Sequence, residues 1–202
     1  MFEYIQNKEL KELLEKDFFS DIVKKQKLRE YGSFFNADNV LQIIQEEPSL
    51  VMCLPDEYIA TKEVAKTVVT QDGSYISFIS QLDRSLVDKE VALESVNYRN
   101  FFIREADFDN SEQVSLDTKM LYEVINAYDA LSLELQNDID IVKTAYLSYK
   151  NIIKYLEENP NPQIRYSDGV VISIDSHEMI NIINDEIMPR LEEKYPEVGL
   201  QK

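Results

Sequence analysis

A two-helix pattern that recurs along the chain is the feature that most restricts how these 202 residues can fold. Its clearest copy lies within residues 71–96, where a turn, a short apolar helix, a second turn and a new helix start follow one another. A single pair of helices this short cannot bury its apolar stripe, so neighbouring copies must stack. The pattern therefore predicts a mostly α fold of stacked helical-hairpin repeats, an α-solenoid.

The first helix of each copy carries an apolar residue in its first turn. These residues recur at intervals of 24, 27, 29 and 21 positions, and from the first copy to the fifth they are Val40, Val64, Val91, Met120 and Ile141. Three positions earlier, the second to fifth copies have good N-cap residues, namely Thr61, Asp88, Asp117 and Asp138. In the first copy, either Asn36 or Asp38 must cap the helix.

A turn and a second helix are expected after each first helix. The second helices are predicted at residues 48–58, 74–82, 100–107, 128–135 and 150–158. Pro48 suits the first turn of a helix, and Gly73 suits a turn between helices. The repeat array is thus expected to occupy residues 36–158.

Residues 1–35 are predicted to form an N-terminal helical segment, because apolar residues recur at helical spacing and Gly32 supplies a stop. Residues 159–202 begin with two prolines, which end the array. Strand-like runs around Ser-Asp-Gly then predict a small C-terminal β-hairpin. Asp175 is expected to cap a final helix that Pro189 kinks or restarts. The predicted ββα piece covers the end of the array.

The motif Asp-Lys-Glu-Val-Ala-Leu-Glu-Ser-Val at 88–96 follows Gly73, Ile76, Phe78, Ile79, Ser80 and Leu82. Together they resemble a short two-helix repeat family, with an Asp-x-Glu-Val helix start, of bacterial, amoebal and viral proteins. This family is catalogued as a domain of unknown function. The copy beginning at Thr61 is similar, and the resemblance covers residues 36–158. It implies a helical solenoid of bacterial or phage type, and it carries no catalytic residues.

The formal net charge of −17 is unevenly distributed. Residues 1–31 hold seven Lys or Arg and seven Asp or Glu, whereas the rest holds 14 and 31. Because phosphate binding needs basic side chains, neither direct nucleic-acid binding nor membrane binding is expected. The acidic surface attracts a basic partner, or it only keeps the protein in solution. One Cys, no run of 18 apolar residues and no signal sequence together predict a cytoplasmic protein.

No set of residues with catalytic or metal-binding spacing is recognisable. Cys53 and His177 are single, which excludes a Cys/His zinc site, and they are expected in the core and in a solvated first helical turn. A calcium loop starting at Asp107 lacks the required Gly and Glu, because Glu112 and Thr118 stand there. Adjacent carboxylates on a helix point about 100° apart and seldom share a site. The chain is therefore predicted to be no enzyme and to need no cofactor or metal.

Aromatic residues cluster near the third and fifth copies, beside an acidic insertion. Aromatic side chains are enriched at the energetic centres of protein interfaces. The residues proposed to contact a partner are Tyr98, Phe101, Asp107, Phe108, Asp109, Glu112 and Tyr149. The alternative is that the aromatic rings fill the core between repeats.

The sequence favours a non-enzymatic helical-repeat protein that binds a protein partner, of which an inhibitor of the immunity or phage counter-defence type is one form. An acidic nucleic-acid mimic in the basic groove of a nuclease or regulator is the first alternative. A hydrolase with converged carboxylates is the second. The oligomeric state is left open.

Overall fold

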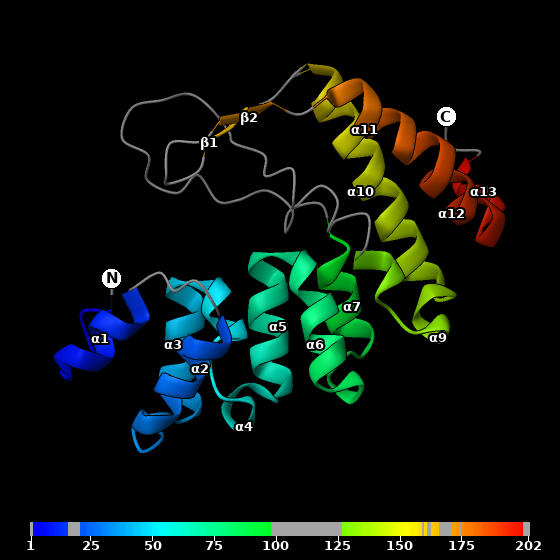
Figure 1. The fold of residues 1–202 in the computed structure, drawn as a ribbon. Coiled ribbons are helices and arrows are strands. Elements are labelled where there is room, and N and C mark those ends of the chain that lie inside the picture. The colour runs from blue at the N-terminus through cyan, green and yellow to red at the C-terminus, as the bar shows by residue number, and fades with distance from the viewer. Residues whose placement is uncertain are drawn as a thin grey trace.

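The computed structural model describes residues 2–15, 21–97, 127–158, 160, 163–165, 171–173 and 175–199. These residues are mostly helical, which confirms the predicted fold class at this level (Figure 1). Among them, no helix is both long and apolar enough to cross a membrane.

The N-terminal segment contains α1 (Lys8–Glu15), α2 (Asp21–Leu28) and the 3-10 turn η1 (Arg29–Tyr31). Leu10, Leu14 and Leu28 bury the apolar stripe that the sequence predicts. The Lys24 side chain is also buried, and its Nζ donates to the Leu14 carbonyl at 2.8 Å. That hydrogen bond offsets part of the cost of taking the ammonium group out of water.

The middle of the chain alternates first helices with shorter second elements. It runs through α3 (Ala37–Glu46), η2 (Pro48–Met52), α4 (Asp56–Ile59), α5 (Lys62–Gln71), η3 (Gly73–Tyr75), α6 (Ile76–Leu82), η4 (Arg84–Leu86) and α7 (Lys89–Ser95). Helix α5 packs against α3 on one side and α7 on the other, and the three helices stand in a row (Figure 1).

The predicted N-caps are confirmed wherever the structure describes them. Asn36, Thr61, Asp88 and Asp138 each accept a hydrogen bond, of 3.0–3.2 Å, from a backbone N–H two or three residues later. These bonds satisfy donors that a helix N-terminus leaves unpaired. Asp117 lies outside the described residues.

The first helices of the second, third and fifth copies bury the same four positions, at i, i+1, i+4 and i+5 from the first apolar residue. These sets are Val64, Ala65, Val68 and Val69; Val91, Ala92, Ser95 and Val96; and Ile141, Val142, Ala145 and Tyr146. The four positions span a wide arc of a helix surface, so each helix has neighbours on two sides. In the first copy the i+5 position is Gln45, which is exposed.

Three predicted second helices differ from the structure, and the one at 100–107 lies outside the described residues. The helix predicted at 48–58 is divided into η2 and α4, with Pro55 as the N-cap of α4. Helix α10 (Ile139–Glu158) runs through residues 147–149, where the prediction places a turn, because these residues contain neither Gly nor Pro. Its buried residues Tyr149, Ile152 and Leu156 continue the stripe of Ala145 at helical spacing. The helix predicted at 128–135 is also wrong, because Ser132 caps a separate short helix, α9 (Leu133–Gln136).

The C-terminal part contains β1 (Gln163–Arg165), β2 (Val171–Ser173), α11 (Ser176–Ile182), the π-helical segment η6 (Ile183–Ile187), α12 (Met188–Lys194) and α13 (Pro196–Gly199). The two strands pair antiparallel, with Ile164 opposite Ile172. The residues joining them lie outside those described, so the hairpin and its capping role stay predictions. Helices α11 and α12 pack on α10.

Two sequence expectations for the final helix are confirmed. Asp175 accepts hydrogen bonds from the backbone N–H groups of His177 and Glu178. Pro189 stands in the first turn of α12, and η6 precedes it directly. Proline has no N–H for the carbonyl one turn earlier, and the wider π turn accommodates this break in the hydrogen-bond ladder.

An ion-pair ladder joins the N-termini of α5, α7 and α10, the first helices of the second, third and fifth copies. Lys62, the first residue of α5, pairs with the N-cap Asp88 and with Glu90 of the next copy. Lys89, at the same position of α7, pairs with the N-cap Asp138 at 2.9 Å and with Asp140 at 2.5 Å. The fifth copy thus stands beside the third in the same register as the third beside the second.

Side-chain hydrogen bonds also connect these helices, each reaching a carbonyl at the C-terminal end of a neighbouring first helix. Gln71 Nε2 donates to the Ile44 carbonyl at 3.1 Å, and Ser148 Oγ donates to the Val96 carbonyl at 2.7 Å. Gln71 and Ser148 each lie seven residues after the first apolar residue of their copies, Val64 and Ile141. A side chain at one repeat position thus satisfies a terminal carbonyl of the neighbouring helix.

Replacing Asp88 separates its capping role from its ion pair with Lys62. Asp88→Ala should lower the free energy of unfolding by about 1 kcal/mol, a typical N-cap loss. Asp88→Asn should retain most of the stabilisation that the cap provides, because Asn caps a helix as well as Asp does. Urea unfolding of both variants measures the difference, and equal losses would show that the charge rather than the cap matters.

The ladder should also make stability depend on pH. Hydrogen bonds from Lys62 lower the pKa of Asp88, and those from Lys66 and Lys62 lower the pKa of Glu90. Carboxylates with a depressed folded-state pKa stabilise the fold above their unfolded values, 3.8 and 4.5, and lose this contribution at lower pH.

Lys62→Met should therefore destabilise the protein most above pH 4.5 and progressively less as the pH falls below 3.8. Denaturant unfolding across that range gives the difference from wild type. Lys154→Met is the control, since Lys154 pairs only within α10 among the described residues. A Lys62→Met effect that did not change with pH would exclude the ion pairs as its cause.

Candidate functional site

A cleft of about 680 Å³ lies between two parts of the fold that are distant in sequence. One wall comes from α6 and η4, and the other from residues 129–135, which include the start of α9. The volume is within the range of about 300–1,000 Å³ that is usual for binding sites. This cleft is the candidate functional site.

The first wall presents a row of hydrogen-bond donors, which we call the donor wall: Ser77, Ser80, Gln81 and Arg84. Ser77, Ser80 and Gln81, at i, i+3 and i+4, lie on one face of α6, because a helix repeats every 3.6 residues. Arg84 follows in η4, after the end of α6 at Leu82. The buried Ile76 and Ile79 hold α6 against the core. The same helix therefore supplies both an anchor and a polar surface.

A local hydrogen bond sets the start of η4 and with it the backbone position of Arg84. Asp83 has an extended backbone, and its carboxylate accepts from the Ser85 N–H at 2.8 Å. Hydrogen bonds from Ser85 lower the pKa of Asp83. The same turn recurs at Glu47 with Ser49 and at Asp72 with Ser74.

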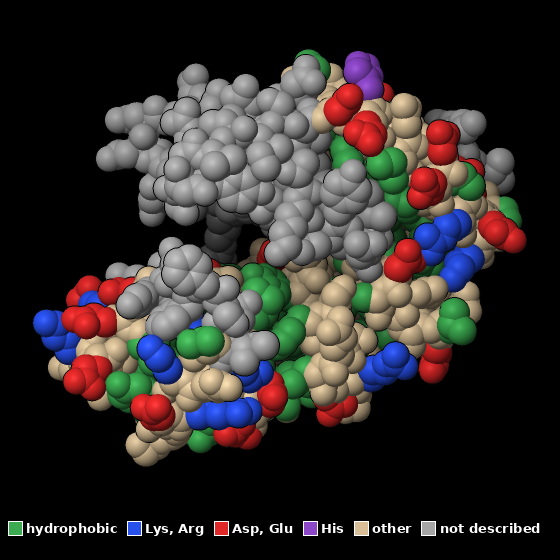
Figure 2. All heavy atoms as spheres, in the orientation of Figure 1, with side chains coloured by type: hydrophobic (Ala, Val, Ile, Leu, Met, Phe, Trp, Pro, Cys, Tyr) green, Lys and Arg blue, Asp and Glu red, His purple; other side chains and the backbone are tan. Residues whose placement is uncertain are grey.

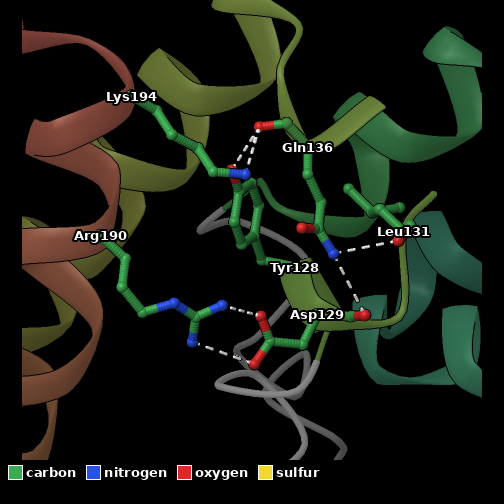
Figure 3. A network of polar contacts seen from close by, with 6 residues as sticks. All are labelled: Tyr128, Asp129, Leu131, Gln136, Arg190 and Lys194. Carbon is green, nitrogen blue, oxygen red and sulfur yellow. Dashed lines mark hydrogen bonds and ion pairs between the residues drawn. The ribbon is translucent and has the colours of Figure 1, made fainter. Parts of the chain in front are cut away.

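The second wall is held by a network of polar contacts (Figure 3). Gln136 Nε2 donates to the carbonyls of Asp129 and Leu131, at 3.3 and 3.0 Å. The backbone carbonyl of Gln136 accepts hydrogen bonds from the Tyr128 hydroxyl at 2.5 Å and from Lys194 Nζ at 3.3 Å. These contacts close residues 128–136 into a compact loop and tie it to α12.

The Tyr128 hydroxyl remains a neutral donor at physiological pH. Its residue is 2 % exposed, and burial raises its pKa to about 12. The ammonium group of Lys194 lies 5.5 Å from the centre of the Tyr128 ring, within reach of a cation–π attraction.

Arg190 of α12 fixes the edge of the same wall through a bidentate ion pair with Asp129 (Figure 3). Nη1 donates to Oδ2 at 3.2 Å, and Nη2 pairs with Oδ1. The hydrogen bonds to Asp129 raise the pKa of Arg190. Asp129 is the one carboxylate among the described residues that line the cleft, and this ion pair neutralises it.

Arg84 and Leu133 are the exposed residues of the cleft whose side chains have no obvious role in the fold. Arg84 forms no ion pair with any acidic side chain that the structure describes. Leu133 is 75 % exposed, the largest value among the described large apolar residues. A cation and an apolar side chain are thus available on opposite walls.

The described residues that line the cleft include no His or Cys and no pair of carboxylates. Acid–base and nucleophilic chemistry need a nucleophile or acid with a base in hydrogen-bond reach. Across the described residues, no three His, Cys, Asp or Glu side chains gather as a metal site would require.

A second, shallower hollow of about 360 Å³ follows α11 and η6. Asp175, Glu178, Asp185 and Glu186 line it together with His177, and none of its described lining residues is Lys or Arg. Figure 2 shows acidic side chains beside the single purple histidine. His177 is exposed in the first turn of α11, as the sequence predicts.

The described residues that line this cleft include none of the predicted partner-binding residues. Six of them lie outside the described residues, namely Tyr98, Phe101, Asp107, Phe108, Asp109 and Glu112. The seventh, Tyr149, is 2 % exposed, so its assignment to a partner surface is wrong. It belongs to the buried stripe of α10, and burial raises its pKa. Cys53 is buried, as expected.

Sequence reasoning overlooked the donor wall, although its signal is visible. Ser77, Ser80 and Gln81 recur at helical spacing and mark one face of a helix whose other face is apolar. No comparable signal marks residues 129–135, because their place opposite α6 comes from contacts with α12.

Comparisons of the chain with protein-family profiles, curated proteins and solved structures found no match. The resemblance to the two-helix repeat family therefore stays a prediction.

The Arg190–Asp129 pair should stabilise the second wall measurably. A double-mutant cycle with Arg190→Ala and Asp129→Ala should give a coupling free energy of up to about 1 kcal/mol, the upper range for partly exposed pairs. Amide hydrogen exchange at residues 129–135 should accelerate in either single variant. The control cycle is Lys8 with Glu12, an exposed pair within one stretch of helix. Equal coupling in both cycles would contradict a special role for Arg190.

Proposed function

We propose that this chain is a non-enzymatic helical-repeat protein that binds a protein partner, and that the cleft between the donor wall and residues 129–135 is its docking site. The observation that carries the proposal is the pairing of an exposed cation, Arg84, with an exposed apolar side chain, Leu133, across one cleft. Protein interfaces combine an apolar contact with a few directed polar ones.

We further propose that the copies form an α-solenoid with a ββα cap. Three observations support this arrangement: the same four buried positions in three first helices, the ion-pair ladder and the matching C-terminal hydrogen bonds. A solenoid presents an extended surface for partners. Blocking the function of the bound protein, as immunity and phage counter-defence proteins do, is one form that this binding can take.

Affinity purification from the native host tests the proposal with matched variants. The cleft variant combines Arg84→Gln with Leu133→Ser. The control variant combines Arg29→Gln with Leu147→Ser, since Arg29 and Leu147 are also exposed and do not line the cleft. Wild type and control should retain one stoichiometric protein that the cleft variant loses. Recovery of no stoichiometric partner by wild type would refute the proposal.

A nucleic-acid mimic is the second candidate, and the acidic hollow along α11 and η6 favours it. A carboxylate surface without neighbouring cations can occupy a basic groove. Binding of this kind falls steeply with salt, because it depends on long-range charge attraction. The affinity of the captured partner should therefore be measured at low and high salt.

The two candidates differ in which variants weaken binding. A mimic should lose affinity when Asp185→Asn is combined with Glu186→Gln. Its affinity should also fall strongly as the salt concentration rises. A cleft binder should lose affinity on Arg84→Gln with Leu133→Ser, and should depend on salt only modestly. The hydrolase alternative receives no support from the residues lining the cleft.

A further inference from the structure

We infer that the cleft recognises an acidic peptide segment of the partner, with a carboxylate bound by Arg84 and an adjacent apolar side chain packed against Leu133. This inference rests on the proposed function and names the chemistry of the bound segment. It follows from the charge, the wall chemistry and the geometry of the cleft.

The charge of the cleft contrasts with that of the whole chain. The formal net charge is −17, yet the described lining contains a single carboxylate, Asp129, which Arg190 neutralises. Arg84 is therefore the charged side chain of the described lining that has no ion pair with a described acidic residue. An arginine can hold a carboxylate through two parallel hydrogen bonds, so an acidic side chain is its natural partner.

The two walls differ in a way that suits an extended peptide. Ser77, Ser80 and Gln81 add uncharged donors beside Arg84, and these can serve the carbonyls of a peptide backbone. The opposite wall contributes Leu133 and Leu135. In an extended chain successive side chains point to opposite sides. One residue then faces Arg84 while its neighbour faces the leucines, so the recognised motif is acidic next to apolar.

Polyanions other than protein fit this cleft poorly. Nucleic acids and anionic membranes carry many phosphates, and one arginine on a strongly acidic chain cannot offset their repulsion. A single carboxylate within a peptide avoids that cost. A second copy of the chain would offer the same chemistry, and the experiment below distinguishes it.

The probe is an N-acetylated, C-amidated hexapeptide with Glu-Leu at its centre, titrated into the isotope-labelled full chain and followed by NMR. Backbone amides near Arg84 and at residues 133–135 should shift and saturate at millimolar peptide. Replacing Glu by Gln in the peptide should weaken binding about tenfold or more, since hydrogen bonds between charged groups are among the stronger ones. A Lys-Leu peptide should not bind.

Protein variants give the matched comparison. Arg84→Gln should lose the preference for Glu over Gln, whereas Arg29→Gln should keep it. Leu133→Ser should weaken binding of the Glu-Leu peptide, whereas Leu147→Ser should leave this binding unchanged. Circular dichroism verifies that each variant is folded; all four replace exposed side chains. Equal binding of the Glu-Leu and Lys-Leu peptides, absence of shifts in wild type, or an unchanged preference in Arg84→Gln would each overturn the inference.

Light scattering tests the second-copy occupant. If wild type is a dimer and Leu133→Ser is a monomer, the cleft is covered by another copy and the inference is wrong. A monomeric wild type that binds the Glu-Leu peptide supports it. The proposed function fails separately: it falls if no partner is captured, whereas a captured partner that is indifferent to Arg84→Gln overturns only the peptide chemistry.

Discussion

The pairing of a lysine at the start of one first helix with two carboxylates at the start of the first helix beside it fixes the register of these helices. Lys62 and Lys89 occupy the same helix position, and each meets an N-cap aspartate and an acidic residue two positions later. Exposed pairs of this kind contribute little energy singly. Their effect is on register: helices with similar apolar stripes can slide, and fixed charges at one end define a single alignment. The ladder ends at Ile139, where the fifth copy has no lysine.

The cleft depends on this register and on a second restraint. The core side of α6 is anchored by isoleucines, so its polar face points away from the core. Residues 129–135 reach the opposite side because Arg190, Lys194 and Gln136 hold them (Figure 3). Charge that would otherwise repel an acidic ligand is removed by the same contacts, since Asp129 is paired with Arg190. One interaction therefore shapes the wall and sets its electrostatics.

The candidate site was less predictable than the fold. Aromatic clustering pointed to Tyr149, which is a core residue, because helical spacing alone does not tell an outward ring from a buried one. Arg84 and Leu133 are 49 positions apart in the chain, and neither stands in a motif. Helix α12 packs against α10 and is bonded to residues 128–136, and this arrangement brings Arg84 and Leu133 to one cleft.

By itself the sequence determined the helical class and the helix starts at Thr61, Asp88 and Asp138, and it narrowed the first cap to Asn36 or Asp38, because capping and apolar periodicity are local properties. It also marked the break at Pro189, which has a local cause. Tertiary structure alone decided that α10 is continuous, that the fifth copy stands beside the third, and that α6 faces residues 129–135. These outcomes depend on contacts between segments that are distant in the sequence, and the spacing of neighbouring residues does not predict the energies of such contacts.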